Sequence, residues 1–246
     1  MKPLYLFLLL CATTICSQAQ DEGEAWKEPS KESRAYHTYR NYMSEPSYGK
    51  LKILGLLKKL TPDEDDNEKL KQSDYLSLTL REKFTYHMMH GESYSQNCDA
   101  RPPIQDEHKK IFGRLPEMFG ENNWSERQVQ FLRSNKDSVM QWIKECVAKE
   151  KRLGLNLKHA IVDINAREMI PFLISTYKTD KKDHDILTVL MLLMKNNEYK
   201  EFMVSTSNKK LYGDEINSYD AFLNFNIPNE ELIIKRATDF YNGLPK

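Results

Sequence analysis

A short segment, His87-Met88-Met89-His90, carries the densest set of potential metal ligands in the chain. His87 and His90 are three residues apart, so on a helix both imidazoles lie on one face. Imidazole binds many transition metals, and the thioethers of Met88 and Met89 would suit Cu(I). Two histidines form only part of a coordination shell, so the alternative is that they sit at a helix C-terminus, where positive charge is favoured. His87 and His90 therefore form a metal-site hypothesis.

The same segment continues into Glu92 and supports one enzymatic hypothesis. His90-Gly91-Glu92-Ser93-Tyr94, at the end of an amphipathic helix, resembles the Glu-Ser-x-aromatic signature of lysozyme-like lytic transglycosylases. The resemblance covers about four residues, and the Gly-Leu-Met-Gln segment found downstream in that family is absent. It implies that Glu92 is a general acid whose raised pKa lets it protonate a glycosidic oxygen of peptidoglycan.

An acidic run that begins at Asp63 could supply oxygen ligands to calcium. If Asp63 is position one of an EF-hand-like loop, Asp65 and Asn67 fall at positions three and five, and Asp74 at position twelve. Position six would be a glutamate instead of the usual glycine. The alternative is that Thr61-Pro62 starts a helix and that the acids complement its positive end.

Cysteine chemistry depends on where the four cysteines lie. Two of them, Cys98 and Cys146, follow the first twenty residues, and an oxidising compartment would allow a disulfide between them. The alternative is that both are unpaired, at least Cys146, which lies on a predicted amphipathic helix. A thiolate–imidazole pair of Cys98 with His159 is a further possibility, although no nucleophile motif surrounds Cys98.

Residues 1–19 have the features of a signal peptide. Lys2 precedes the apolar stretch Leu4–Ile15, and small residues lie at the −3 and −1 positions of a cleavage site after Ala19. The apolar stretch is shorter than the roughly 20 residues that cross a bilayer. Two cysteines in this segment leave lipoprotein anchoring as an alternative, although a large residue precedes each. We expect a soluble protein exported to the periplasm or the extracellular space.

Composition excludes several classes of function. The 246 residues contain 36 Lys+Arg and 36 Asp+Glu, and a balanced charge does not fit a dedicated nucleic-acid binder. Only 9 residues are glycine, which argues against β-rich folds with many tight turns. No glycine-rich phosphate loop or Gly-x-Ser-x-Gly nucleophile motif is present.

The distribution of apolar residues predicts an all-α fold. Residues 20–35 are expected to be a flexible polar leader, followed by one helical domain over 36–246 with a possible subdivision near 153–156. Helix start signals occur at Thr61, Thr79 and Ser125. Further predicted helices or helical starts cover 36–43, 51–60, 139–147, 166–177, 184–196, 198–205 and 229–242. Residues 166–204, with an internal Pro171, resemble a HEAT-type αα-hairpin, so we expect an irregular bundle or a short HEAT-like stack.

These observations favour a binding or interaction protein over an enzyme. We expect it to recognise another protein or a cell-wall component through a groove between helices, without nucleic acid or a resident cofactor. The aromatic residues expected at such a surface are Tyr36, Tyr39, Tyr42 and Trp124. A peptidoglycan-cleaving enzyme centred on Glu92 and a metal-binding protein are the alternatives.

Overall fold

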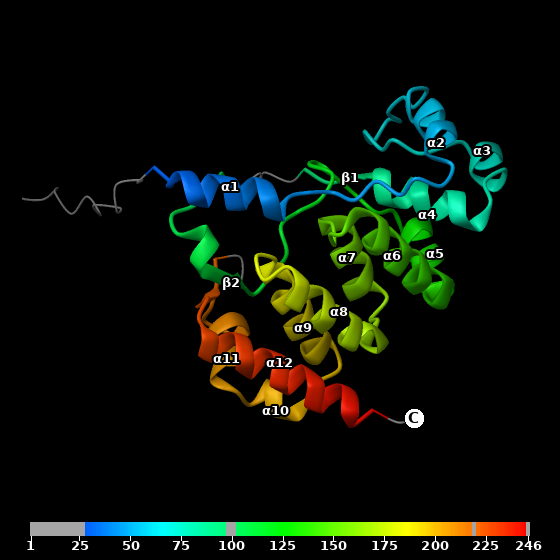
Figure 1. Ribbon diagram of the computed structural model, residues 1–246. Helices are drawn as coiled ribbons and strands as arrows, with labels where there is room; N and C mark the ends of the chain where they lie inside the picture. Colours follow the sequence, from blue (N-terminus) through cyan, green and yellow to red (C-terminus); the bar gives the residue numbers. More distant parts are fainter. Residues whose placement is uncertain (1–27, 97–101, 218–219, 245–246) are drawn as a thin grey trace, which may run out of the picture.

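The computed structural model describes residues 28–96, 102–217 and 220–244, and Figure 1 shows that they are mainly helical. Helix accounts for 58% of the structure and strand for 5%, which confirms the prediction of a broadly all-α fold. The finer prediction of a HEAT-like stack stays a prediction. No helix in the described ranges is long and apolar enough to cross a membrane.

Most elements of the fold are short helices joined by loops. The α-helices are α1 (Lys31–Arg40), α2 (Lys50–Leu57), α3 (Gln72–Leu76), α4 (Leu80–Met89), α5 (Glu126–Ser134), α6 (Lys136–Glu150), α7 (Leu155–Asp163), α8 (Ile170–Thr179), α9 (His184–Asn196), α10 (Lys200–Met203), α11 (Thr206–Tyr212) and α12 (Ile227–Asn242). Short 3₁₀ helices cover η1 (Glu107–Lys109) and η2 (Arg167–Met169). The strands are β1 (Ser93–Tyr94), β2 (Lys110–Phe112), β3 (Asn122–Asn123) and β4 (Phe222–Asn224).

The main core is built around α9. Its sequence is apolar on almost every face, and nearly all of its side chains are buried, which is the pattern of a central helix. Helices α7, α8 and α12 pack against it, and the lower half of Figure 1 shows this arrangement. Pro171 lies in the first turn of α8 and not in its interior, so this helix needs no kink.

A second, smaller core lies under α2, α3 and α4, at the upper right of Figure 1. Ile53, Tyr75 and Tyr86 are among its buried members. The capping box predicted at Thr79 is present and starts α4. The helix predicted at Thr61-Pro62 is wrong, because no helix begins before Gln72 in this stretch.

Local hydrogen bonds explain the missing helix. The Asp63 carboxylate accepts hydrogen bonds from the backbone N–H groups of Asp65 and Asn67, at 3.0 and 2.9 Å. A side chain that satisfies nearby backbone donors in this way stabilises a turn in competition with a helix. The acids after Pro62 therefore do not lie at a helix N-terminus, so the alternative explanation for them is wrong. The calcium site itself stays a prediction.

Two small antiparallel sheets hold the loops in place. Strand β1 pairs with β3, and β2 pairs with β4. Gly91 immediately precedes β1, and a Cβ atom at this position would lie 2.8 Å from the carbonyl oxygen of Asn123. Glycine is therefore required at position 91 by the close approach of the two segments.

The N-terminal helix begins earlier than the sequence indicated. Helix α1 starts at Lys31, inside the expected leader, with Ser30 as its N-cap. Its last residue, Arg40, is 7% exposed and donates hydrogen bonds to Asp185 at 2.7 Å and to Glu107 at 3.1 Å. The helix is thus attached to the body through a buried ion-pair network.

Candidate functional site

A pocket of about 250 Å³ lies between α4, α6 and the segment that precedes α2. Eleven residues line it: Pro46, Ser47, Tyr48, Arg81, Phe84, Thr85, Trp142, Glu145, Cys146, Lys149 and Glu150. Most of them come from two helices of at least ten residues. The pocket is therefore shaped mainly by regular secondary structure.

The spacing of the lining residues follows from helix periodicity. On α4 they are Arg81, Phe84 and Thr85, at positions i, i+3 and i+4. On α6 the pattern runs through i, i+3, i+4 and i+7 from Trp142 to Lys149. Residues with these separations lie on one face of a helix. Each helix thus presents one face to the pocket.

The pocket floor is aromatic. The rings of Phe84 and Trp142 lie 5.4 Å apart at an angle of 46°, and Phe84 is only 1% exposed. Thr85 beside them is buried, and its hydroxyl is occupied by the carbonyl oxygens of Tyr48 and Arg81. Trp142, which is only partly buried, thus supplies apolar surface to the pocket beside a hydroxyl that is already bonded, which favours an apolar ligand group.

The rim carries charge, and its two carboxylates are already engaged. The Arg81 guanidinium lies 4.9 Å from the Tyr48 ring centroid and forms an ion pair with Glu145. Gln141 occupies the other oxygen of Glu145. Glu150 accepts hydrogen bonds from the hydroxyl groups of Ser44, at 2.6 Å, and Tyr42, at 3.3 Å.

The cationic donors of the rim are less fully used. Arg81 donates to Glu145 through Nη2 alone, so Nε and Nη1 have no acceptor in the described part of the chain. The exposed Lys149 has neither a hydrogen bond nor an ion pair there. The rim therefore has spare donors on its positive groups.

Cys146 forms part of the pocket wall and is half-buried. Burial, reinforced by the neighbouring carboxylate of Glu150, raises the pKa of its thiol to about 11. Such a thiol is mostly protonated near neutral pH, so it behaves as a small apolar wall group. Cys98, its expected disulfide partner and the proposed partner of His159, lies outside the described residues, and both pairings stay predictions.

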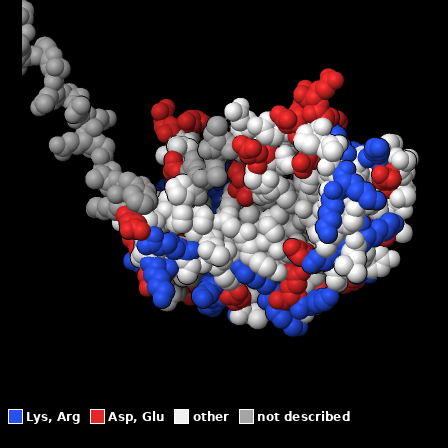
Figure 2. All heavy atoms as spheres, turned by 90° about the horizontal axis from the view of Figure 1, so that it is seen from above, with Lys and Arg blue, Asp and Glu red and all other residues white. Residues whose placement is uncertain are grey.

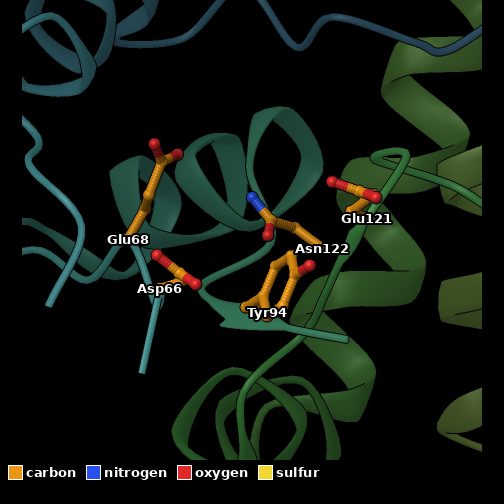
Figure 3. Close-up of a pocket in the computed structure, with 5 residues that line it drawn as sticks. All are labelled: Asp66, Glu68, Tyr94, Glu121 and Asn122. Atoms are coloured by element: carbon orange, nitrogen blue, oxygen red, sulfur yellow. The ribbon is translucent and has the colours of Figure 1, made fainter. Parts of the chain in front are cut away.

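A second hollow, of about 490 Å³, is lined by oxygen-bearing side chains (Figure 3). Asp66 and Glu68 come from the loop before α3, Tyr94 from β1, and Glu121 and Asn122 from the β3 segment. Within the described ranges, no group of three or more acidic, histidine or cysteine side chains is arranged to hold a metal ion. Three of the five lining residues are acidic, so the hollow is an acidic part of the surface.

Glu92 lies in a buried hydrogen-bond network and is 0% exposed. Its carboxylate accepts bonds from Tyr86 at 2.7 Å and Ser125 at 2.5 Å, and it forms an ion pair with Arg127. Burial alone would raise the pKa of Glu92, but the hydrogen bonds from Arg127, Ser125 and Tyr86 outweigh it and leave the pKa lowered. A general acid needs a raised pKa, whereas these bonds lower it and favour a structural ion pair; the catalytic role of Glu92 stays a prediction.

The two predicted metal ligands lie in different surroundings. His87 is fully buried, its Nε2 lies 3.3 Å from the Tyr75 hydroxyl, and its Nδ1 has no partner in the described structure. Burial, with the nearby charges of Arg127 and Lys83, holds the pKa of His87 well below its usual range. The His90 ring is 2.6 Å from the carbonyl oxygen of Glu68.

Of the aromatic residues expected at a binding surface, two are poorly available. Tyr36 is 7% exposed and packs against His184, and Trp124 donates its indole N–H to the carbonyl of His87. Tyr39 and Tyr42 are more exposed, but the Arg152 guanidinium lies over both rings. The ring of His159 is held by the carbonyl oxygen of Pro116. Tyr42 remains 36% exposed, and the expected aromatic binding surface stays a prediction.

Charge on the outer surface is unevenly distributed. Figure 2 shows acidic side chains gathered along one edge of the upper face and basic side chains along another, with an uncharged region between them. The balanced composition thus conceals local patches of each sign.

Comparisons with protein-family models, with curated proteins and with solved structures found no match to this chain.

Proposed function

We propose that this protein is a binding protein that recognises its partner by seating an apolar group in the pocket between α4 and α6. The observation that carries the proposal is the aromatic floor of Phe84 and Trp142 inside a charged rim. An apolar pocket with a few convergent polar groups is the usual form of a binding site. The helices that form it would require little rearrangement on binding.

The proposed role does not require catalysis. The Cys146 thiol has a raised pKa, so it is a poor nucleophile, and the rim carboxylates already accept hydrogen bonds. These features support recognition by shape and charge. The lysozyme-like and metal-binding alternatives remain hypotheses without a supporting feature at this pocket.

A pocket-filling substitution tests the proposal. Cys146→Phe places a ring in the pocket, whereas Ala148→Phe adds a ring of the same kind at an exposed position of the same helix. Random synthetic peptides with free ends are screened for binding to the full chain. We expect selected peptides to contain an aromatic or large aliphatic residue, and to lose binding to Cys146→Phe but not to Ala148→Phe. Peptides that bind both variants equally well would overturn the proposal.

A further inference from the structure

The charges on the pocket rim restrict what the partner can present. Both oxygens of Glu145 accept hydrogen bonds, from Arg81 and Gln141, and one oxygen of Glu150 accepts hydrogen bonds from Ser44 and Tyr42. A positively charged ligand at Glu145 would therefore compete with bonds that the protein already makes. One face of the Tyr48 ring, a natural place for a cation, is also covered by the guanidinium of Arg81.

An anionic group, by contrast, would meet hydrogen-bond donors that have no acceptor in the described structure. Arg81 keeps two donor nitrogens without an acceptor in the described structure, and Lys149 keeps its whole ammonium group. Arg81 and Lys149 both line the pocket, together with Cys146. A carboxylate between Arg81 and Lys149 would receive charge-assisted hydrogen bonds.

The size of the pocket indicates how the carboxylate is presented. About 250 Å³ is below the roughly 300–1,000 Å³ of typical small-molecule sites, yet it can hold one side chain. A ligand that fits this pocket would combine one apolar side chain beside Trp142 with a carboxylate at the rim. The C-terminal residue of a polypeptide has both groups on a single residue.

We propose that the pocket captures the C-terminal residue of a partner polypeptide, with an aromatic or large aliphatic side chain on the floor and the terminal carboxylate between Arg81 and Lys149. This inference rests on the proposed function and specifies its ligand. The Arg81–Glu145 ion pair orients the guanidinium, so the carboxylate meets one preplaced cation and one exposed cation.

Three synthetic peptides test the inference against the full chain by isothermal titration. They share one sequence and end in Phe with a free carboxylate, in Phe with a C-terminal amide, or in Ala with a free carboxylate. We expect the free Phe peptide to bind at least about tenfold more tightly than the other two, from the loss of a charge-assisted bond or of the apolar group.

Two charge reversals on α6 provide the matched control. Lys149→Glu changes the rim, whereas Lys144→Glu makes the same change at an exposed position outside the pocket. We expect Lys149→Glu to remove the preference for the free acid over the amide, and Lys144→Glu to keep it.

The outcomes separate the two proposals. Equal binding of acid and amide, with both lost in Cys146→Phe, would overturn the C-terminal inference and leave the pocket as the binding site. Absence of saturable binding by all three peptides would overturn the inference. A free Phe peptide whose affinity is unchanged in Cys146→Phe would overturn the proposed function as well.

Discussion

Replacing Arg127 with alanine should destabilise the protein strongly, because it leaves the buried Glu92 carboxylate without its cation. Glu92 is 0% exposed, and Arg127 donates to it through Nε at 3.0 and 2.7 Å and through Nη2. Arg127 also bonds the carbonyl oxygen of Leu70 at 2.9 Å and lies over the Tyr75 ring, so it joins α5 to the smaller core.

The magnitude follows from the burial of the pair. Removing one partner of a buried ion pair costs about 3–5 kcal/mol, because the remaining charge stays desolvated. Glu92→Gln removes the charge itself, and Arg127, whose side chain is 28% exposed, can regain water. We therefore expect Glu92→Gln to cost about 1–3 kcal/mol. The double variant should cost less than the sum of the two single variants.

The pH dependence gives a second readout. In the wild type the pKa of Glu92 is lowered, so its contribution is present above the unfolded-state pKa of about 4.3 and lost as the pH falls through the folded-state pKa. Without Arg127, burial would raise the pKa of Glu92 above its unfolded-state value. The ionised carboxylate would then destabilise the folded state at neutral pH instead of stabilising it. The difference in unfolding free energy between wild type and Arg127→Ala should therefore be larger at pH 7 than at pH 4.

Urea unfolding followed by far-UV circular dichroism measures these free energies. A cost below about 1 kcal/mol for Arg127→Ala at pH 7 would refute the buried-pair reasoning.

A cell-wall turbidity assay separates the catalytic hypothesis for Glu92 from the structural one. Wild-type clearing that a folded Glu92→Gln variant loses would establish Glu92 as catalytic.

Three further predictions concern α1 and the pocket. Arg40→Ala removes the guanidinium shared by the buried Glu107 and Asp185, and it should cost about 3–5 kcal/mol in urea unfolding. Arg34→Ala, at an exposed ion pair, should change the unfolding free energy by less than about 1 kcal/mol, and equal costs would contradict the difference in burial. Burial would raise the pKa values of Glu107 and Asp185, but His37 and Arg40 lower that of Glu107, and Arg40 and Lys158 lower that of Asp185. Thermal stability should therefore be retained above about pH 4 and fall as the pH decreases through the lowered pKa values. A melting temperature that rises on acidification would be inconsistent with this linkage. Alkylation of Cys146 by iodoacetamide, in a Cys98→Ser background, should be slow at pH 8 and accelerate toward its pKa of about 11; a rate that is already maximal at pH 8 would show an activated thiolate.

The sequence predicted the elements that have strong local signals. The α4 capping box at Thr79 and the bounds of α9 were both identified correctly. The helix at Thr61-Pro62 was wrong because the same acidic residues that suit a helix N-terminus can also close a turn on their own backbone. The two small sheets were missed because strands of two or three residues have no measurable periodicity.

The candidate site was less accessible to sequence analysis. Phe84 and Trp142 are separated by more than fifty positions, and nothing in their local patterns indicates that α4 and α6 face each other. Glu92 was identified as a chemical residue, but its environment depends on Arg127, an ordinary surface position by pattern. Spacing within one helix is thus predictable, whereas the pairing of charges and rings between elements requires the tertiary structure.

Binding of the peptide with a free C-terminal Phe to wild type and to Cys146→Phe tests the central claim most directly. We predict saturable one-to-one binding to the wild type and to Ala148→Phe, with at least a tenfold loss (~1.4 kcal/mol) in Cys146→Phe. Equal affinity for Cys146→Phe and the wild type would contradict the assignment of the pocket between α4 and α6 as the binding site.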